Sequence, residues 1–380
     1  MWFILMGIFA VYGVDLKSPL EGTSYFSLRP QSFALFGANL GVVGAMLYTG
    51  RHFYKAMARK AVGLKAAEET DTTLVTAFRV FAVATLLLII QLRVIGIGLP
   101  LAIPYVCIMI IGFVVLSRTI AETGLIYLKC YFWPCATLWG LFGARALGPH
   151  QLLLMMMVST VLFIDPREAL MPFMVNSLKV LELRKVRLGK PAAWCTIALV
   201  VGLAVSIPVT LYIKYDLGSA TGDGWSTITV PRVAFDNAVM AQRKLQTQGV
   251  IVDESGSFLS RLGYTAPNPV CVWMMIAGFV LVIAFTAARL RFEWWPLHPL
   301  MFVVWASTPL RLMGVSYLLG WGIKSLITRY GGSHTYNRIK PLMLGLIAGE
   351  VLSALFPTIF GAIYYFITNE QPQMFNVIPG

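Results

Sequence analysis

Long apolar stretches alternate with short polar segments along most of this chain. Continuous apolar runs such as 106–116 and 276–285 lack the strict alternation that is typical of a strand in a membrane barrel. A helix needs roughly twenty apolar residues to cross the hydrocarbon core, and it satisfies all of its backbone hydrogen bonds within the segment. The pattern therefore predicts an all-α fold, a polytopic transmembrane helical bundle that forms a single integral membrane domain over 1–380.

About ten segments have the composition of a membrane span and a length close to the one it needs. Pro309, Gly314 and Gly320 interrupt one apolar run, and broken helices at membrane depth often line a substrate cavity, so we expect a broken or re-entrant region near 297–328. The predicted spans are 1–14, 32–50, 76–97, 100–117, 125–145, 150–164, 192–213, 270–288, the region 297–328, and 341–367.

Composition and charge agree with a membrane protein. Hydrophobic residues make up 58% of the chain and charged residues 12%, which is too little polar surface for an exterior in water. The net charge of +13 would suggest nucleic-acid binding on a soluble domain. Here most of the basic excess lies next to the apolar segments, so we predict no nucleic acid among the partners. The expected partners are the lipid bilayer and other membrane subunits or further copies of the chain.

The basic residues also predict an orientation. Lys and Arg gather at 51–65, 165–191, 289–291 and 329–340, between the predicted spans. Cytoplasmic loops carry such an excess, and all four intervals fall on one side if 297–328 enters and leaves on the same side. This predicts an integral membrane protein with a cytoplasmic N-terminus. An extracytoplasmic loop follows at about 214–269, and residues 231–246 of this loop suit a surface helix.

Ionisable side chains in or beside the predicted spans are candidates for function, because a charge within hydrocarbon must face protein or water. Arg118 and Glu122 stand four residues apart, share a helix face and can pair. They could line a solute path or form a structural ion pair at a helix end, and the sequence leaves both interpretations open. Glu350 lies well inside the last predicted span, where it must be protonated or meet a partner such as Lys324 or Arg311.

Two further polar residues have distinctive neighbours. His298 lies between Pro296 and Pro299 and follows a tryptophan pair, which suits an interfacial aromatic anchor. Its imidazole could titrate near neutral pH, although a lone histidine is more often a hydrogen-bonding structural residue. Asn39 lies inside a Gly-x-x-x-Gly pattern that permits close helix approach, so we expect it to hydrogen bond to the neighbouring helix.

Enzyme signatures are scarce in the sequence, and an intramembrane enzyme is only the third hypothesis. It contains no His-Glu-x-x-His, no Gly-x-Ser-x-Gly, no P-loop and no Gly-x-Gly-x-x-Gly. The four histidines are not spaced as a metal or haem site, and the five cysteines form no ligand pattern. We therefore predict that the protein is not an enzyme and has no catalytic residues, no metal site and no cofactor.

Five short strings, taken together, carry a family resemblance. They are RTIAETGL at 118–125, PREALMP at 166–172, WPLHPL at 295–300, WGIKSLITRYGG at 321–332 and GLIAGE at 345–350. In this order they resemble an uncharacterised family of bacterial polytopic membrane proteins, which is in turn distantly similar to the oligopeptide transporter superfamily over the last hundred or so residues. The match runs from about 118 to the end of the chain. Members of that family are considerably longer at the N-terminus, so an inverted-repeat transport path is expected to be incomplete here.

The resemblance implies a helical, transporter-like fold in the bacterial cytoplasmic membrane, and it suggests Glu122, His298, Lys324 and Glu350 as positions to test. Together with the charge pattern, it gives the hypothesis of an integral membrane transporter-like protein that moves a small polar solute or peptide. The alternative is a non-transporting structural or accessory subunit of a larger membrane complex. The predicted substrate or coupling path consists of Arg118, Glu122, His298, Arg311, Lys324 and Glu350.

Overall fold

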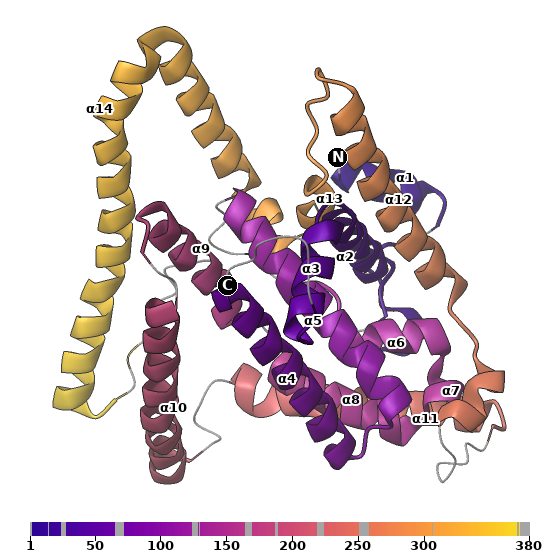
Figure 1. Ribbon diagram of the computed structural model, residues 1–380. Helices are drawn as coiled ribbons and strands as arrows, with labels where there is room; N and C mark the ends of the chain where they lie inside the picture. The colour runs from indigo at the N-terminus through magenta and orange to yellow at the C-terminus, as the bar shows by residue number, and fades with distance from the viewer. Residues whose placement is uncertain are drawn as a thin grey trace. The chain divides into compact units, whose positions relative to one another are not determined.

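Every regular element in the described part of the chain is a helix, which confirms the all-α prediction for those residues (Figure 1). The computed structural model describes all residues except 1, 14, 24–27, 65–71, 124–127, 129, 164–168, 187–188, 219–223, 251–257, 306, 371 and 373–380. The start of the basic interval 165–191, residues 165–168, lies outside the described residues. The chain divides into two compact units, Met1–Ser307 and Thr308–Gly380, and each is described by itself below.

The helices of the first unit run from α1 to α13, and α14 belongs to the second. In chain order they are α1 (Trp2–Val11), the 3₁₀ helix η1 (Leu20–Gly22), α2 (Pro30–Thr49), α3 (Arg51–Ala61), α4 (Thr72–Ile95), α5 (Leu99–Thr123), α6 (Pro134–Phe142), α7 (Ala144–Leu147), α8 (Pro149–Leu162), α9 (Leu170–Leu183), α10 (Gly189–Leu217), the π-helix η4 (Trp225–Thr229), α11 (Val230–Thr247), the 3₁₀ helix η5 (Phe258–Tyr264), α12 (Pro269–Arg291), α13 (Met301–Val304) and α14 (Thr308–Thr368).

Six of these helices are long and apolar enough to cross a membrane, which supports the prediction of a polytopic helical membrane protein. They are α2, α4, α5, α12, most of α10 and most of α14. The predicted count of about ten spans is not confirmed. Predicted spans 1–14, 125–145 and 150–164 contain only short helices among their described residues: α1 with 10 residues, α6 with 9 and α8 with 14.

Glycine and proline explain why the apolar stretch from α6 to α8 does not form long helices. Gly143 has φ +80° and Gly148 has φ +83°, in the left-handed region that favours glycine, so each ends the helix before it. Pro134 and Pro149 then open α6 and α8 at their first turns, where the missing N–H has no intrahelical role. The composition of this stretch suits a span, but its glycines and prolines divide it into short helices.

Helices α2 and α12 form the closest pairing in the first unit. A Cβ added to Gly37 would overlap the backbone carbonyl of Met275, and one added to Gly278 would overlap that of Ala34. A Cβ on Gly41 would lie 2.9 Å from the Cβ of Val282. The Gly-x-x-x-Gly prediction of a tight helix contact is therefore confirmed.

The predicted role of Asn39 in this contact is wrong. Its side chain is buried, but Nδ2 donates to the Leu35 carbonyl of the same helix at 2.7 Å, one turn back. An asparagine inside a helix can donate to the carbonyl four residues back, and this local bond satisfies the donor without a contact to α12.

The largest core cluster of the first unit joins α2, α5, α6 and α8. Phe33, Tyr105, Trp139 and Met155 are almost completely buried in it. The hydroxyl groups of Tyr105 and Ser159 form a buried hydrogen bond of 2.7 Å, which satisfies both polar groups within the core. This core fixes α5, which carries two of the predicted site residues.

A side-chain amide holds the turn between α4 and α5. Gln151 Nε2 donates to the Gly96 carbonyl at 3.0 Å, and its Oε1 accepts from the Gly98 N–H at 3.1 Å. Both backbone groups would otherwise lack a helical partner at this turn. The amide thus connects the turn to α8.

The predicted helix at 231–246 is confirmed as α11. It packs against α8 with one apolar face, while its other face is exposed. The buried residues recur at helical spacing and are Val233, Ala234, Asn237, Ala238, Ala241 and Leu245. After it, buried Arg261 donates from Nη2 to the Leu147 carbonyl at 3.0 Å, which joins η5 to α7.

The second unit is dominated by the 61-residue helix α14, which kinks at Gly332 (Figure 1). The φ of Gly332 is +68°, a conformation that glycine adopts without steric cost. The predicted interruption at 297–328 is correct only for its first part. The chain is irregular from 292 to 300, whereas Gly314, Gly320 and Gly322 lie inside continuous helix.

Candidate functional site

Three candidate spans of the first unit end around one pocket of about 560 Å³, which is lined by apolar side chains and a few charged ones. The C-terminal turns of α2, α5 and α12 line it together with α3 and the segment that follows α12. Its lining residues are Val42, Ala45, Met46, Thr49, Gly50, Tyr54, Arg118, Glu122, Thr286, Arg289, Leu290, His298, Pro299 and Leu300. Helices α2 and α12 are parallel, since Gly37 meets Met275 and Gly41 meets Val282. Their C-terminal turns therefore lie at the same end of the bundle, beside the pocket.

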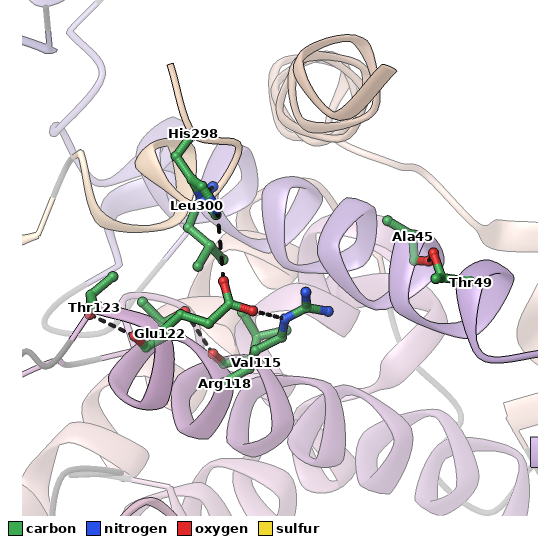
Figure 2. A network of polar contacts seen from close by, with 9 residues as sticks. Ala45, Thr49, Val115, Arg118, Glu122, Thr123, His298 and Leu300 are labelled. Carbon is green, nitrogen blue, oxygen red and sulfur yellow. Dashed lines mark hydrogen bonds and ion pairs between the residues drawn. The ribbon is translucent and has the colours of Figure 1, made fainter. Parts of the chain in front are cut away.

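Glu122 stands at the centre of the polar groups in this pocket (Figure 2). Its Oε1 accepts a hydrogen bond from Arg118 Nε at 2.7 Å, as the spacing of four residues predicts. Its Oε2 lies 3.9 Å from Nε2 of His298. The carboxylate therefore faces a cation on its own helix and an imidazole from a distant part of the sequence.

The backbone around His298 determines which nitrogen faces the carboxylate. The Leu300 N–H donates to His298 Nδ1 at 3.2 Å, so Nδ1 carries no proton in this arrangement. The neutral imidazole then has its proton on Nε2, the nitrogen nearest Glu122. Protonation of the ring would break the Leu300 contact while adding a cation beside Glu122.

Two opposing influences set the pKa of His298. Burial lowers this pKa most strongly, and the neighbouring guanidinium groups of Arg289 and Arg118 lower it further. The Glu122 carboxylate raises it, but the net direction is below the ordinary value. The histidine is thus poised to stay neutral until the pH falls below its usual titration range.

Aromatic packing holds the irregular segment that carries His298. The ring of Trp295 meets Phe285 of α12 edge-on, with centroids 5.3 Å apart. Phe302 of α13 packs against the same Phe285 at 4.6 Å, and Trp305 packs on Phe302 at 5.2 Å. These edge-to-face contacts are a favourable geometry for aromatic pairs, and they fasten both ends of the segment to α12 and α13.

The pocket carries an excess of positive charge when His298 is neutral. The guanidinium groups of Arg118 and Arg289 line it against the single carboxylate of Glu122. The Arg118 and Glu122 side chains are 39% and 36% exposed, so water screens this pair and the pair alone adds little stability. In the sequence, Arg289 indicates only that the end of its span faces the cytoplasm. Its place at the end of a span gave no signal of a shared pocket.

Helix α3 adds basic side chains at the same end of the bundle. It follows α2 directly, buries Ala56 and Met57, and exposes Arg51, Lys55 and Arg59. Its last carbonyls are capped from α4, because Arg79 donates to Ala61 O at 2.8 Å and to Lys60 O at 3.2 Å. Tyr54 of α3 reaches the pocket lining.

The structure brings together three of the six predicted path residues, Arg118, Glu122 and His298. The other three belong to α14 in the second unit. Arg311 lies in the first turn of α14, and its side chain is outside the description. Lys324 Nζ lies 5.8 Å from the ring centre of Tyr336. Glu350 is exposed on the part of α14 that follows the kink at Gly332. Between the described Lys324 and Glu350 there is no ion pair, so this suggested pairing is wrong for the second unit taken by itself.

The arrangement can bind and orient charged groups, and it can exchange a proton at His298. Within the part of the chain that the structure describes, no group of three or more His, Cys, Asp or Glu side chains could hold a metal ion. The chemistry that the described pocket supports is therefore ionic recognition by two guanidinium groups, one carboxylate and one imidazole.

Comparisons with known proteins place the chain in a family. No curated protein and no solved structure matches it significantly. One family model, described as a family of unknown function (DUF6785), matches residues 1–373. The match does not test the resemblance to the oligopeptide transporter superfamily, because the function of the matched family is unknown. Because the model covers nearly the whole chain, the protein belongs to the DUF6785 family.

Proposed function

We propose that the protein is a transporter-like integral membrane protein of the bacterial cytoplasmic membrane, and that it moves a small polar solute or peptide through the first unit. The observation that carries the proposal is the charged pocket at the shared ends of α2, α5 and α12. Its volume of about 560 Å³ is in the range of small-molecule sites. Charged side chains beside candidate spans mark solute paths in many membrane proteins.

The basic residues around the pocket support a cytoplasmic location for it. Arg51, Lys55 and Arg59 of α3 and Arg289 and Arg291 of α12 gather at this end. Loops and helix ends that carry such an excess stay in the cytoplasm. The pocket would then be an inner vestibule. The cytoplasmic N-terminus stays a prediction, because the 10-residue α1 rises only about 15 Å, half of the hydrocarbon thickness.

Flux measurements on the reconstituted chain test the transport proposal. Purified protein in proteoliposomes is offered a panel of amino acids, dipeptides and small carboxylates, and electrogenic or radiolabelled uptake is recorded. We expect saturable uptake of at least one solute, reduced at least about tenfold by Glu122→Gln because the charged centre of the pocket is lost. The matched control is Glu182→Gln, since Glu182 pairs with Lys179 at 2.7 Å on α9, away from the pocket lining.

The second candidate is a structural or accessory subunit, and one observation favours it. Gly345 and Gly349 repeat the small-residue spacing of α2 on α14, yet a Cβ at either position meets no described atom within 4 Å. A second chain could pack there. Stable co-purification with other chains from native membrane, together with no uptake of any panel solute, would replace the transport proposal by this one.

A further inference from the structure

The two pocket arginines have donors that the fold does not use. Arg118 bonds to Glu122 through Nε, which leaves the four N–H groups of its two terminal nitrogens outside that contact. Arg289 makes no hydrogen bond or ion pair with any residue that the structure describes, and its side chain lines the pocket. A guanidinium with unused donors in a pocket is suited to a carboxylate or phosphate, whose oxygens match its fork geometry.

We infer that this pocket binds an oxyanion group, a carboxylate or phosphate, between the guanidinium groups of Arg118 and Arg289. The inference deepens the proposed function and rests on it, because it assigns the solute class of the same pocket. Glu122 has a positioning role here: it fixes the Arg118 guanidinium at 2.7 Å and limits the excess positive charge to one when His298 is neutral. That balance favours a singly charged anion over a multiply charged one.

His298 makes the affinity depend on pH. The charged and titratable groups around it are Arg118 and Glu122 from α5, Arg289 from α12 and Tyr54 from α3, while α2 contributes none. Protonation of the imidazole adds a second excess positive charge to the lining. An anion should therefore bind more tightly as the pH falls through the titration of His298, and a bound anion should in turn favour the protonated ring.

Helix ends offer a purely structural explanation for the same arginines. The last carbonyls of α2, α5 and α12 carry partial negative charge, which basic side chains in the final turn stabilise. Arg289 and Arg291 lie two residues apart in the last turn of α12 and share this role. Arg289 lines the pocket and Arg291 does not, so the pair separates anion binding from dipole compensation.

Calorimetric titration of the full-length protein with inorganic phosphate in detergent at pH 6 provides the test. We expect saturable binding that Arg289→Gln weakens at least about tenfold, because a charge-assisted bidentate contact is lost. Arg291→Gln should change the affinity less than about twofold, since it removes the same charge outside the pocket. The pH comparison uses formate, because it keeps one negative charge from pH 5 to pH 8 whereas phosphate gains a second. The wild type should bind formate more tightly at pH 5 than at pH 8, and His298→Asn should bind it equally at both, because an asparagine at this position can still accept from the Leu300 N–H but does not titrate.

A second arm separates a soluble anion from a lipid headgroup. The protein is placed in nanodiscs of phosphatidylcholine with or without phosphatidylglycerol, and retained lipid is counted by native mass spectrometry. Phosphatidylglycerol retained by the wild type and by Arg291→Gln, but lost from Arg289→Gln, would assign the oxyanion to a lipid. Phosphate binding with no such lipid retention would assign it to a soluble solute, and both results support the inference.

The inference and the transport proposal can fail separately. Equal phosphate affinity and equal lipid retention in Arg289→Gln and Arg291→Gln would overturn the oxyanion site, whatever the flux measurements show. Anion binding that depends on Arg289, in a protein that transports none of the panel solutes, would uphold the site and contradict transport. Monodisperse elution of both variants in size-exclusion chromatography confirms that the comparison is made on folded protein.

Discussion

The same Gly-x-x-x-Gly spacing occurs in both units of the molecule with different outcomes. In α2, Gly37 and Gly41 lie against the backbone and side chains of α12, with no room for a Cβ at Gly37. In α14, added Cβ atoms at Gly345 and Gly349 meet no described atom within 4 Å. The spacing permits a close helix contact, but a complementary partner such as Gly278 on α12 is what produces one.

The carboxylates of the two units differ in a parallel way. Glu122 of the first unit has Arg118 and His298 within ion-pair distance. Glu350 of the second unit is exposed and has no side-chain hydrogen bond or ion pair to a described residue. Within the described residues, the first unit therefore supplies partners for its pocket carboxylate, and the second unit supplies none for Glu350.

The largest expected effect comes from filling the α2–α12 contact. Gly37→Ala places a methyl group on the Met275 carbonyl, so the two backbones must separate along the tightest pairing in the first unit. We expect a loss of about 2–3 kcal/mol in the free energy of unfolding. Unfolding by sodium dodecyl sulfate in mixed micelles, followed by tryptophan fluorescence, measures it.

Gly349→Ala is the matched control for that substitution. The added methyl meets no described atom, and alanine has the better helix propensity, so stability should stay the same or rise by up to about 1 kcal/mol. If both variants lose stability equally, α14 has a close partner at Gly349 and the contrast between the units is wrong. If Gly37→Ala does not yield folded protein while Gly349→Ala does, the contrast stands.

The sequence predicts contacts that depend on local spacing. Arg118 and Glu122 are four apart on one helix, and the structure pairs them. Gly37 and Gly41 are likewise four apart and form a close face. Residues 231–246 form the expected helix because their apolar positions recur with helical period. Periodicity within one element requires no knowledge of the fold.

Contacts between distant elements could not be predicted in this way. The approach of His298 to Glu122 depends on the parallel pairing of α2 and α12 and on aromatic packing around Phe285. Arg289 enters the pocket for the same reason. The predicted count of about ten spans is not confirmed, and one reason is that hydropathy alone does not show that Gly143 and Gly148 divide an apolar stretch. Both glycines are visible in the sequence, but their positive φ angles are visible only in the structure.

A smaller effect on the free energy of unfolding is expected from removing the charge of Glu122 or of Glu350. Glu122→Gln loses a partly exposed pair with Arg118 and should lower the free energy of unfolding by about 0.5 kcal/mol. Glu350→Gln should cause no measurable change in the same detergent titration, since no described residue pairs with it. A loss of stability in Glu350→Gln as large as in Glu122→Gln would show that the second unit provides a partner for its carboxylate.

The smallest effect is the pH dependence that His298 gives to the first unit. Because its pKa in the folded protein lies below the ordinary value, chiefly through burial, the unfolded chain binds a proton more readily. The neutral histidine therefore contributes stability above its ordinary pKa, and this contribution is lost as the pH falls toward and through the folded-state pKa. The side chain is 45% exposed and Glu122 opposes the shift, so the slope should be shallow. Unfolding of wild type and His298→Asn at pH 8 and pH 5 measures it. The wild type should lose more stability than the variant, and an equal loss in both would show that His298 does not sense pH in the fold.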